Sequence, residues 1–197
     1  MKPNRCALSF VLLLPLVLLA AGCGSKKETS STPVQVLPAA RTAGEWAGRI
    51  VNRFIRPTNS DIQALLALNN PQTKIYLQER NPNTIAVIDK RMNDLGRCSD
   101  RLATIGPPPQ TAVHKQQLNQ VDTALQRACR HYAKVSRIVL DAVRLLSSDN
   151  SDDHLRGLKK LPEAIPDARA GSLAYDQGVM IAQRLPEFRR HGLKPAA

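Results

Sequence analysis

Residues 111–147 of this 197-residue chain read TAVHKQQLNQVDTALQRACRHYAKVSRIVLDAVRLLS. Apolar side chains recur in this stretch at alternating spacings of three and four residues: Leu118, Val121, Leu125, Ala128, Tyr132, Val135, Val139, Ala142 and Leu146. Such a period places one apolar stripe along a single helix, which would be ~55 Å long. Because small and aromatic residues interrupt the stripe, it favours packing inside an antiparallel bundle over a dimeric coiled coil.

A second long helix is predicted over about 83–105, immediately before the first. Its apolar residues follow the same helical period and are Ile85, Ile88, Met92, Leu95, Cys98, Leu102 and Ile105. The run Gly106-Pro107-Pro108-Pro109 ends it, since proline cannot continue a helix. No segment alternates apolar and polar residues as a strand would. The sequence therefore predicts an all-α antiparallel helical bundle over 41–197, with two long helices and several shorter ones.

The shorter helices are interrupted by prolines. A helix from Ala43 is expected to end before Pro57, and Asn59-Ser60-Asp61 is expected to cap a new one. A final helix is expected over 167–185, and its large apolar residues are Leu173, Val179, Met180 and Ile181. The small residues Gly171, Ala174 and Gly178 of that helix would let a neighbouring backbone approach closely.

The N-terminus is typical of an export signal. Lys2 and Arg5 precede an apolar run that is too short to span a bilayer, so residues 1–22 are interpreted as a signal peptide. The run ends in Leu19-Ala20-Ala21-Gly22-Cys23, which resembles the lipobox of bacterial lipoproteins. The resemblance implies that Cys23 becomes the first residue of the mature chain and carries a diacylglycerol. The alternative is ordinary signal-peptide cleavage nearby, with Cys23 incidental.

A lipid on Cys23 implies a protein anchored to a bacterial membrane rather than spanning it. Gly24 after the cysteine resembles the outer-membrane sorting case, so the expected place is the periplasmic face of the outer membrane if the cell has two membranes. Otherwise it is the outer face of the cell membrane. Residues 23–40, rich in Ser, Thr, Lys and Pro, are expected to form a flexible tether between the lipid and the bundle.

The chain is strongly basic, with 28 Lys and Arg against 16 Asp and Glu. Removal of residues 1–22 takes away two cations and no acid, which leaves the mature chain at +10. This charge favours anionic envelope partners, and Lys26, Lys27, Arg189, Arg190 and Lys194 are candidate contacts for an anionic surface. A merely solubilising surface is the alternative. Nucleic acid is disfavoured by the export signal and by an aromatic content of only 4%.

Cys98 and Cys129 are the cysteines left after processing and lipidation, and in an oxidising compartment we expect them to form a disulfide. A metal site is disfavoured because no CxxC or paired histidine motif accompanies them. A simple turn at 106–110 would offset the two residues by ~16 Å, whereas a disulfide needs Cα atoms ~4.4–6.8 Å apart. The connection must therefore climb before the next helix begins, or the helices must cross steeply. Otherwise both thiols are free.

No catalytic, nucleotide-binding or metal motif is present, so neither a cofactor nor an enzymatic activity is expected. The favoured function is a non-enzymatic envelope lipoprotein that binds a partner protein or an anionic envelope component. An exposed apolar groove lined from 46–77 would support binding of a partner's helix. One alternative is a carrier of lipid or haem, for which Met92 and His114 are the only ligand pair. Another is an enzyme whose polar cluster the fold would assemble from distant residues, and the sequence does not motivate naming His114, His131 or 149–153 as that cluster.

Overall fold

The computed structural model describes residues 36–194, and within them every regular element is helical. The predicted all-α bundle is confirmed. The elements are α1 Ala43–Arg49, the π-helix η1 Ile50–Ile55, α2 Arg56–Ala67, α3 Pro71–Gln78, α4 Pro82–Gly96, α5 Cys98–Ile105, α6 Lys115–Leu146, α7 Ser151–Lys160, the 3₁₀ helix η2 Leu161–Ala164, α8 Ile165–Arg184 and α9 Pro186–Arg189.

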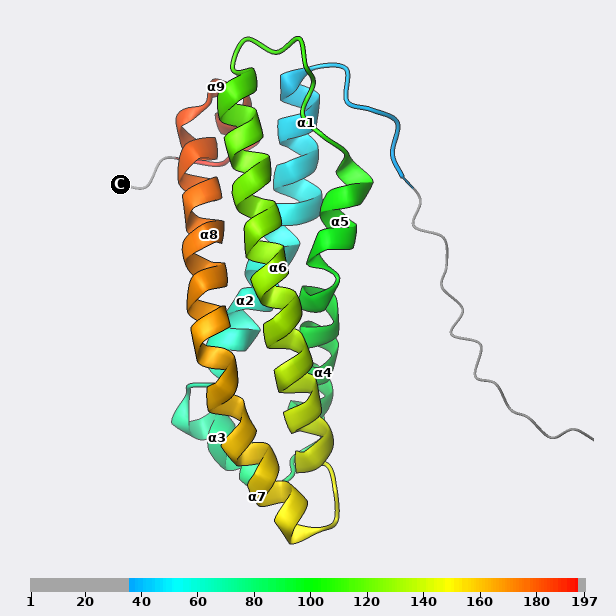
Figure 1. Cartoon of the computed structure of the whole chain (residues 1–197), viewed down its shortest axis with the longest axis vertical. Helices are drawn as coiled ribbons and strands as arrows, with labels where there is room; N and C mark the ends of the chain where they lie inside the picture. Colours follow the sequence, from blue (N-terminus) through cyan, green and yellow to red (C-terminus); the bar gives the residue numbers. More distant parts are fainter. Residues whose placement is uncertain (1–35, 195–197) are drawn as a thin grey trace, which may run out of the picture. The chain divides into compact units, whose positions relative to one another are not determined.

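Helix α6 is the centre of the bundle, with α8 on one side and α4 and α5 on the other (Figure 1). All nine apolar residues of its predicted stripe are fully buried. Its most extensive neighbour is α8, not the helix that immediately precedes it in sequence. The predicted pair of long helices is therefore only part of the core.

The helix predicted over 83–105 is two helices, and the prediction of one is wrong. The break lies at Arg97, whose φ of −88° and ψ of 12° separate α4 from α5. Gly96 precedes it and lies against Ser136 of α6, where an added Cβ would be 3.2 Å from the serine Cβ. Glycine weakens a helix interior and permits this close approach. Because the apolar period continues through the break, the sequence pattern does not reveal it.

The prediction that the first helix ends before Pro57 is also wrong. Helices α1, η1 and α2 follow one another without interruption from Ala43 to Ala67. Proline lacks an N–H and crowds the preceding turn, and the π-helical turn just before it supplies a wider ring, in which Arg56 N–H bonds to the Val51 carbonyl. Asn59-Ser60-Asp61 is consequently the interior of a helix and not a cap.

The last long helix, α8, agrees with its predicted range and buries the face that carries its small residues. Leu173 and Met180 are 66% and 53% exposed and lie outside the core, whereas Val179 and Ile181 are partly buried against it. The buried face carries small residues and one aromatic residue: Gly171, Ala174, Tyr175, Gly178 and Ala182. The expected close approach is confirmed, since a Cβ on Gly178 would lie 3.0 Å from Leu125 Cδ2. Small side chains rather than large ones therefore join α8 to α6.

Substitution of Gly171 by alanine tests this close packing. A Cβ there would lie 2.8 Å from Cε1 of the fully buried Tyr132 ring, so we expect the free energy of unfolding to fall by about 1–3 kcal/mol. Gly44→Ala is the matched control, because nothing lies within 4 Å of its Cβ position. At this helical site alanine should instead stabilise by about 0.5–1 kcal/mol. Urea unfolding of both variants measures the difference, and equal effects would contradict the packing.

Candidate functional site

Cys98 and Cys129 form a disulfide, with their Cα atoms 5.3 Å apart. Cys98 lies ~10 Å along the axis from the end of α5, and Cys129 lies ~21 Å from the start of α6. The proline-rich connection over 106–114 runs on along the bundle axis before α6 begins, and this makes up the difference between the two distances (Figure 1). Trp46 holds the first residue of this connection in place, because its Nε1 donates a hydrogen bond to the Gly106 carbonyl oxygen at 3.0 Å. The first of the two geometries expected for a bonded pair is thus correct.

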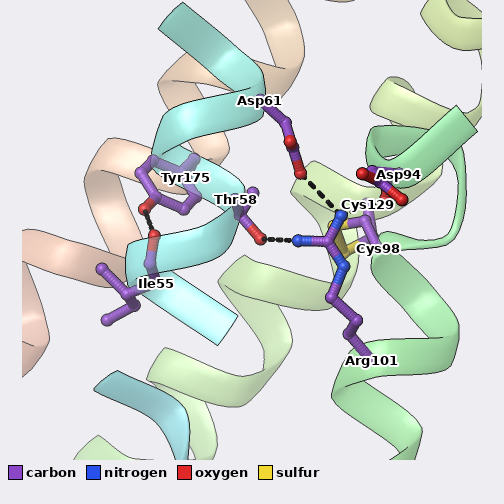
Figure 2. The surroundings of a disulfide bond; sticks show 8 residues. All are labelled: Ile55, Thr58, Asp61, Asp94, Cys98, Arg101, Cys129 and Tyr175. Atoms are coloured by element: carbon purple, nitrogen blue, oxygen red, sulfur yellow. Dashed lines mark hydrogen bonds and ion pairs between the residues drawn. A yellow bond between two sulfur atoms is a disulfide. The ribbon is translucent and has the colours of Figure 1, made fainter. Parts of the chain in front are cut away.

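A buried carboxylate lies beside the disulfide (Figure 2). Asp61 on α2 is 2% exposed, and its Oδ2 accepts from Arg101 Nη2 on α5 at 2.6 Å. Its Oδ1 accepts from Arg91 on α4 at 3.3 Å. Arg101 also donates to the buried Thr58 hydroxyl and to the Asp94 backbone carbonyl. Since two guanidinium groups flank one carboxylate, the cluster joins α2 to α4 and α5 rather than presenting a reactive group.

Sequence reasoning missed this cluster because it ended the helix before Pro57. A helix continued through Pro57 places Thr58, Asp61, Ile62 and Leu65 on one face, at the spacing i, i+3, i+4 and i+7. All four are buried. That periodicity was the available signal, and it would have identified Asp61 as a buried polar residue needing a partner.

The histidines form separate pairs between helices. Nδ1 of His114 lies 2.8 Å from Glu187, and Nδ1 of His131 lies 2.7 Å from Asp167. The hydrogen bond to His131 lowers the pKa of Asp167. Burial raises the pKa of Glu187, but the bond to His114 and nearby positive charge outweigh burial and leave it below its ordinary value.

These pairs do not assemble into a site. His114 and His131 are seventeen residues, or ~25 Å, apart along α6. Met92 is fully buried on α4. The Cys98–Cys129 disulfide lies between Met92 and His114 along the bundle, so the two residues do not face one ligand. Within residues 36–194 no serine or cysteine is hydrogen-bonded to His131, and no cluster of three or more His, Cys, Asp or Glu side chains could hold a metal.

An apolar groove of about 350 Å³ separates α2 and α3 from α7, η2 and the start of α8. One wall is formed by residues 65–78 and the other by residues 158–168, with Val139 of α6 at the base. Its apolar lining residues are Leu65, Leu66, Leu68, Val139, Leu158, Leu161, Pro162, Ala164, Ile165 and Ala168. Leu66 and Ile165 are 52% and 49% exposed, one on each wall. The groove therefore presents large aliphatic side chains to solvent from both sides.

The prediction of a groove lined by residues 46–77 is only half correct. Residues 46–55 do not line it, because Trp46, Ile50 and Phe54 are fully buried in the core. The second wall, 158–168, had no signal in the sequence, since Pro162 and Pro166 indicated an interruption there. In the structure each proline is the second residue of its helix, within the first turn, where a missing N–H is tolerated.

The predicted anionic-surface contacts divide into two groups. Cys23, Lys26 and Lys27 lie outside the described residues. Arg189, Arg190 and Lys194 are exposed and follow or belong to α9, which packs on α1. No helix within residues 36–194 is long and apolar enough to cross a membrane. Comparison with protein-family models, curated proteins and solved structures finds no match to this chain.

Proposed function

We propose that this chain is a non-enzymatic, lipid-anchored protein of the bacterial envelope that binds an apolar helical segment of a partner protein. The lipobox-like Cys23 is the proposed attachment point for the lipid. The groove between α2–α3 and α7–η2–α8 is the proposed binding site, and its two exposed aliphatic walls are the observation that carries the proposal.

The chemistry of the groove suits the apolar face of an amphipathic helix. Such a helix presents apolar side chains at i, i+3, i+4 and i+7, and these side chains can insert into an aliphatic groove. Asn69, Lys74 and Gln78 are the polar lining residues, all from the α2–α3 wall. A polar rim around an apolar centre is the usual arrangement of a protein interface, and Lys74 favours a partner with an acidic residue on that side.

Paired charge substitutions in the groove test this function. Leu66→Glu with Ile165→Glu places a carboxylate on each wall, and we expect crosslinking of the partner in intact cells to fall at least tenfold. The matched control is Leu173→Glu with Met180→Glu, which adds the same charge at apolar positions of α8 that are at least as exposed and lie outside the groove. The control should keep the wild-type yield of one crosslinked envelope protein.

Two other outcomes decide against parts of the proposal. Equal crosslinking by both double variants would remove the groove from partner binding. If a lipid co-purified with the native protein and was absent only from the groove variant, that result would instead favour a small-ligand carrier. A volume of 350 Å³ is adequate for such a ligand. Anchoring is tested separately, since Cys23→Ser must lower both the mass of the mature chain and its membrane-bound fraction.

A further inference from the structure

Three segments that are far apart in sequence meet at one end of the bundle (Figure 1). Trp46 of α1 packs edge-on against Phe188 of α9 with their ring centroids 5.9 Å apart. His191, just beyond α9, lies 2.9 Å from the Gly44 carbonyl oxygen. The pair of His114 and Glu187 connects the start of α6 to α9. We call this surface the basic end and define it as residues 36–49, 106–118 and 184–194.

The basic end holds most of the excess positive charge of the described chain. It has seven Lys and Arg against two carboxylates, and both carboxylates are already paired, Glu45 with Arg49 and Glu187 with His114. No carboxylate within residues 36–194 is at ion-pair distance from the exposed cations Lys115, Arg184, Arg189, Arg190 and Lys194. The opposite end, residues 68–82 and 147–163, has five cations and five carboxylates and so carries no net charge.

The chain enters the bundle at the basic end. Leu37 N–H donates to the Thr104 carbonyl at 3.1 Å, and Arg49 donates to the Pro38 carbonyl at 2.5 Å. Cys23 is thirteen residues upstream of Val36, so the two can be at most about 45 Å apart. A lipid on Cys23 would therefore keep the basic end within about 45 Å of the bilayer, whereas the groove end lies farther along the bundle from the attachment point.

From these observations we propose that the basic end binds the anionic phosphates of lipid headgroups and orients the bundle with its apolar groove directed away from the membrane. This inference rests on the proposed lipid anchor. Exposed cations next to an anionic leaflet each contribute to membrane binding, and this attraction adds to the anchoring by the lipid chains on Cys23. Orientation follows because the groove end, whose five cations are balanced by five carboxylates, has no net attraction to an anionic surface.

The test uses the full mature chain with Cys23→Ser, so that binding does not depend on the lipid. It is mixed with vesicles of phosphatidylglycerol and phosphatidylcholine, and separately with vesicles of phosphatidylcholine alone. We expect salt-sensitive binding to the anionic vesicles only. Adding Arg189→Gln, Arg190→Gln and Lys194→Gln should weaken that binding about 100-fold. The matched control carries Lys90→Gln, Lys159→Gln and Arg169→Gln, three exposed cations outside the basic end, and should change it less than threefold.

Equal losses in the two triple variants would overturn the inference, as would absence of binding to anionic vesicles. Binding to a soluble polyanion but not to the vesicles would assign the surface to an anionic polymer instead and would also overturn it. Failure of the proposed function is distinguishable from failure of this inference. It would appear as a mature chain without lipid, or as partner binding that the groove substitutions do not change. Neither result depends on the vesicle measurement.

Discussion

Substitution of Arg101 by alanine is expected to lower the free energy of unfolding by about 3–5 kcal/mol. The guanidinium group is the nearest partner of Asp61, at 2.6 Å, and Asp61 is 2% exposed. Removing Arg101 leaves a carboxylate in the interior with only the longer contact to the half-exposed Arg91. The Thr58 hydroxyl and the Asp94 carbonyl lose a donor as well. Chemical unfolding of the variant measures the loss.

A second substitution separates the buried charge from the lost packing. Asp61→Asn removes the charge that Arg101 neutralises, so the double variant should be more stable than the sum of the two single losses implies. Arg97→Ala is the control on the same segment, because Arg97 is exposed, and it should change stability by less than about 0.5 kcal/mol. Strict additivity of Arg101→Ala and Asp61→Asn would show that the ion pair does not hold α2 to α5.

Loss of the Cys98–Cys129 disulfide is expected to cost about 3.5–4 kcal/mol. The bond closes a loop with a sequence separation of 31, and the chain-entropy model relates the stabilisation to that length. For a domain of this size the loss corresponds to a fall in Tm of about 10 °C. The measurement compares thermal unfolding of the oxidised chain with that of Cys98→Ala/Cys129→Ala.

Both half-cystines are fully buried, so reductant should act on the native bundle only slowly. A peptide map of the unreduced protein must contain the linked pair of peptides that carry Cys98 and Cys129. Free thiols at both positions, or a double variant as stable as the oxidised protein, would contradict the assigned bond. The Gly171→Ala and Gly44→Ala pair provides an independent scale for the size of these effects.

The helical class and the central helix could be predicted because they depend on local periodicity. The stripe from Leu118 to Leu146 requires only that the chain be helical and that one face be apolar, and all of it is buried. The disulfide could also be expected, since Cys98 and Cys129 are the two cysteines that would remain if residues 1–22 were removed and Cys23 carried the proposed lipid. Its geometry depended on how far 106–114 climbs, which local rules do not specify.

The errors arose where local signals and tertiary packing disagreed. Pro57 normally ends a helix, yet a π-helical turn carries the chain through it and places Asp61 in the interior. Leu173 and Met180 are more hydrophobic than Gly171 and Gly178, yet the glycines face α6 because they allow the two backbones to approach. A single sequence shows which side chains are apolar but not which neighbour each face will meet.

By itself the sequence determined the helical bundle, the buried stripe of α6, the pair of cysteines available for a bond and the excess of positive charge. Only the tertiary structure decided where the candidate sites lie. The groove joins residues 65–78 to 158–168, and the basic end joins 36–49, 106–118 and 184–194. Periodicity is a property of neighbouring residues along one helix. The groove and the basic end are created by contacts between segments many tens of residues apart, which depend on how the helices pack.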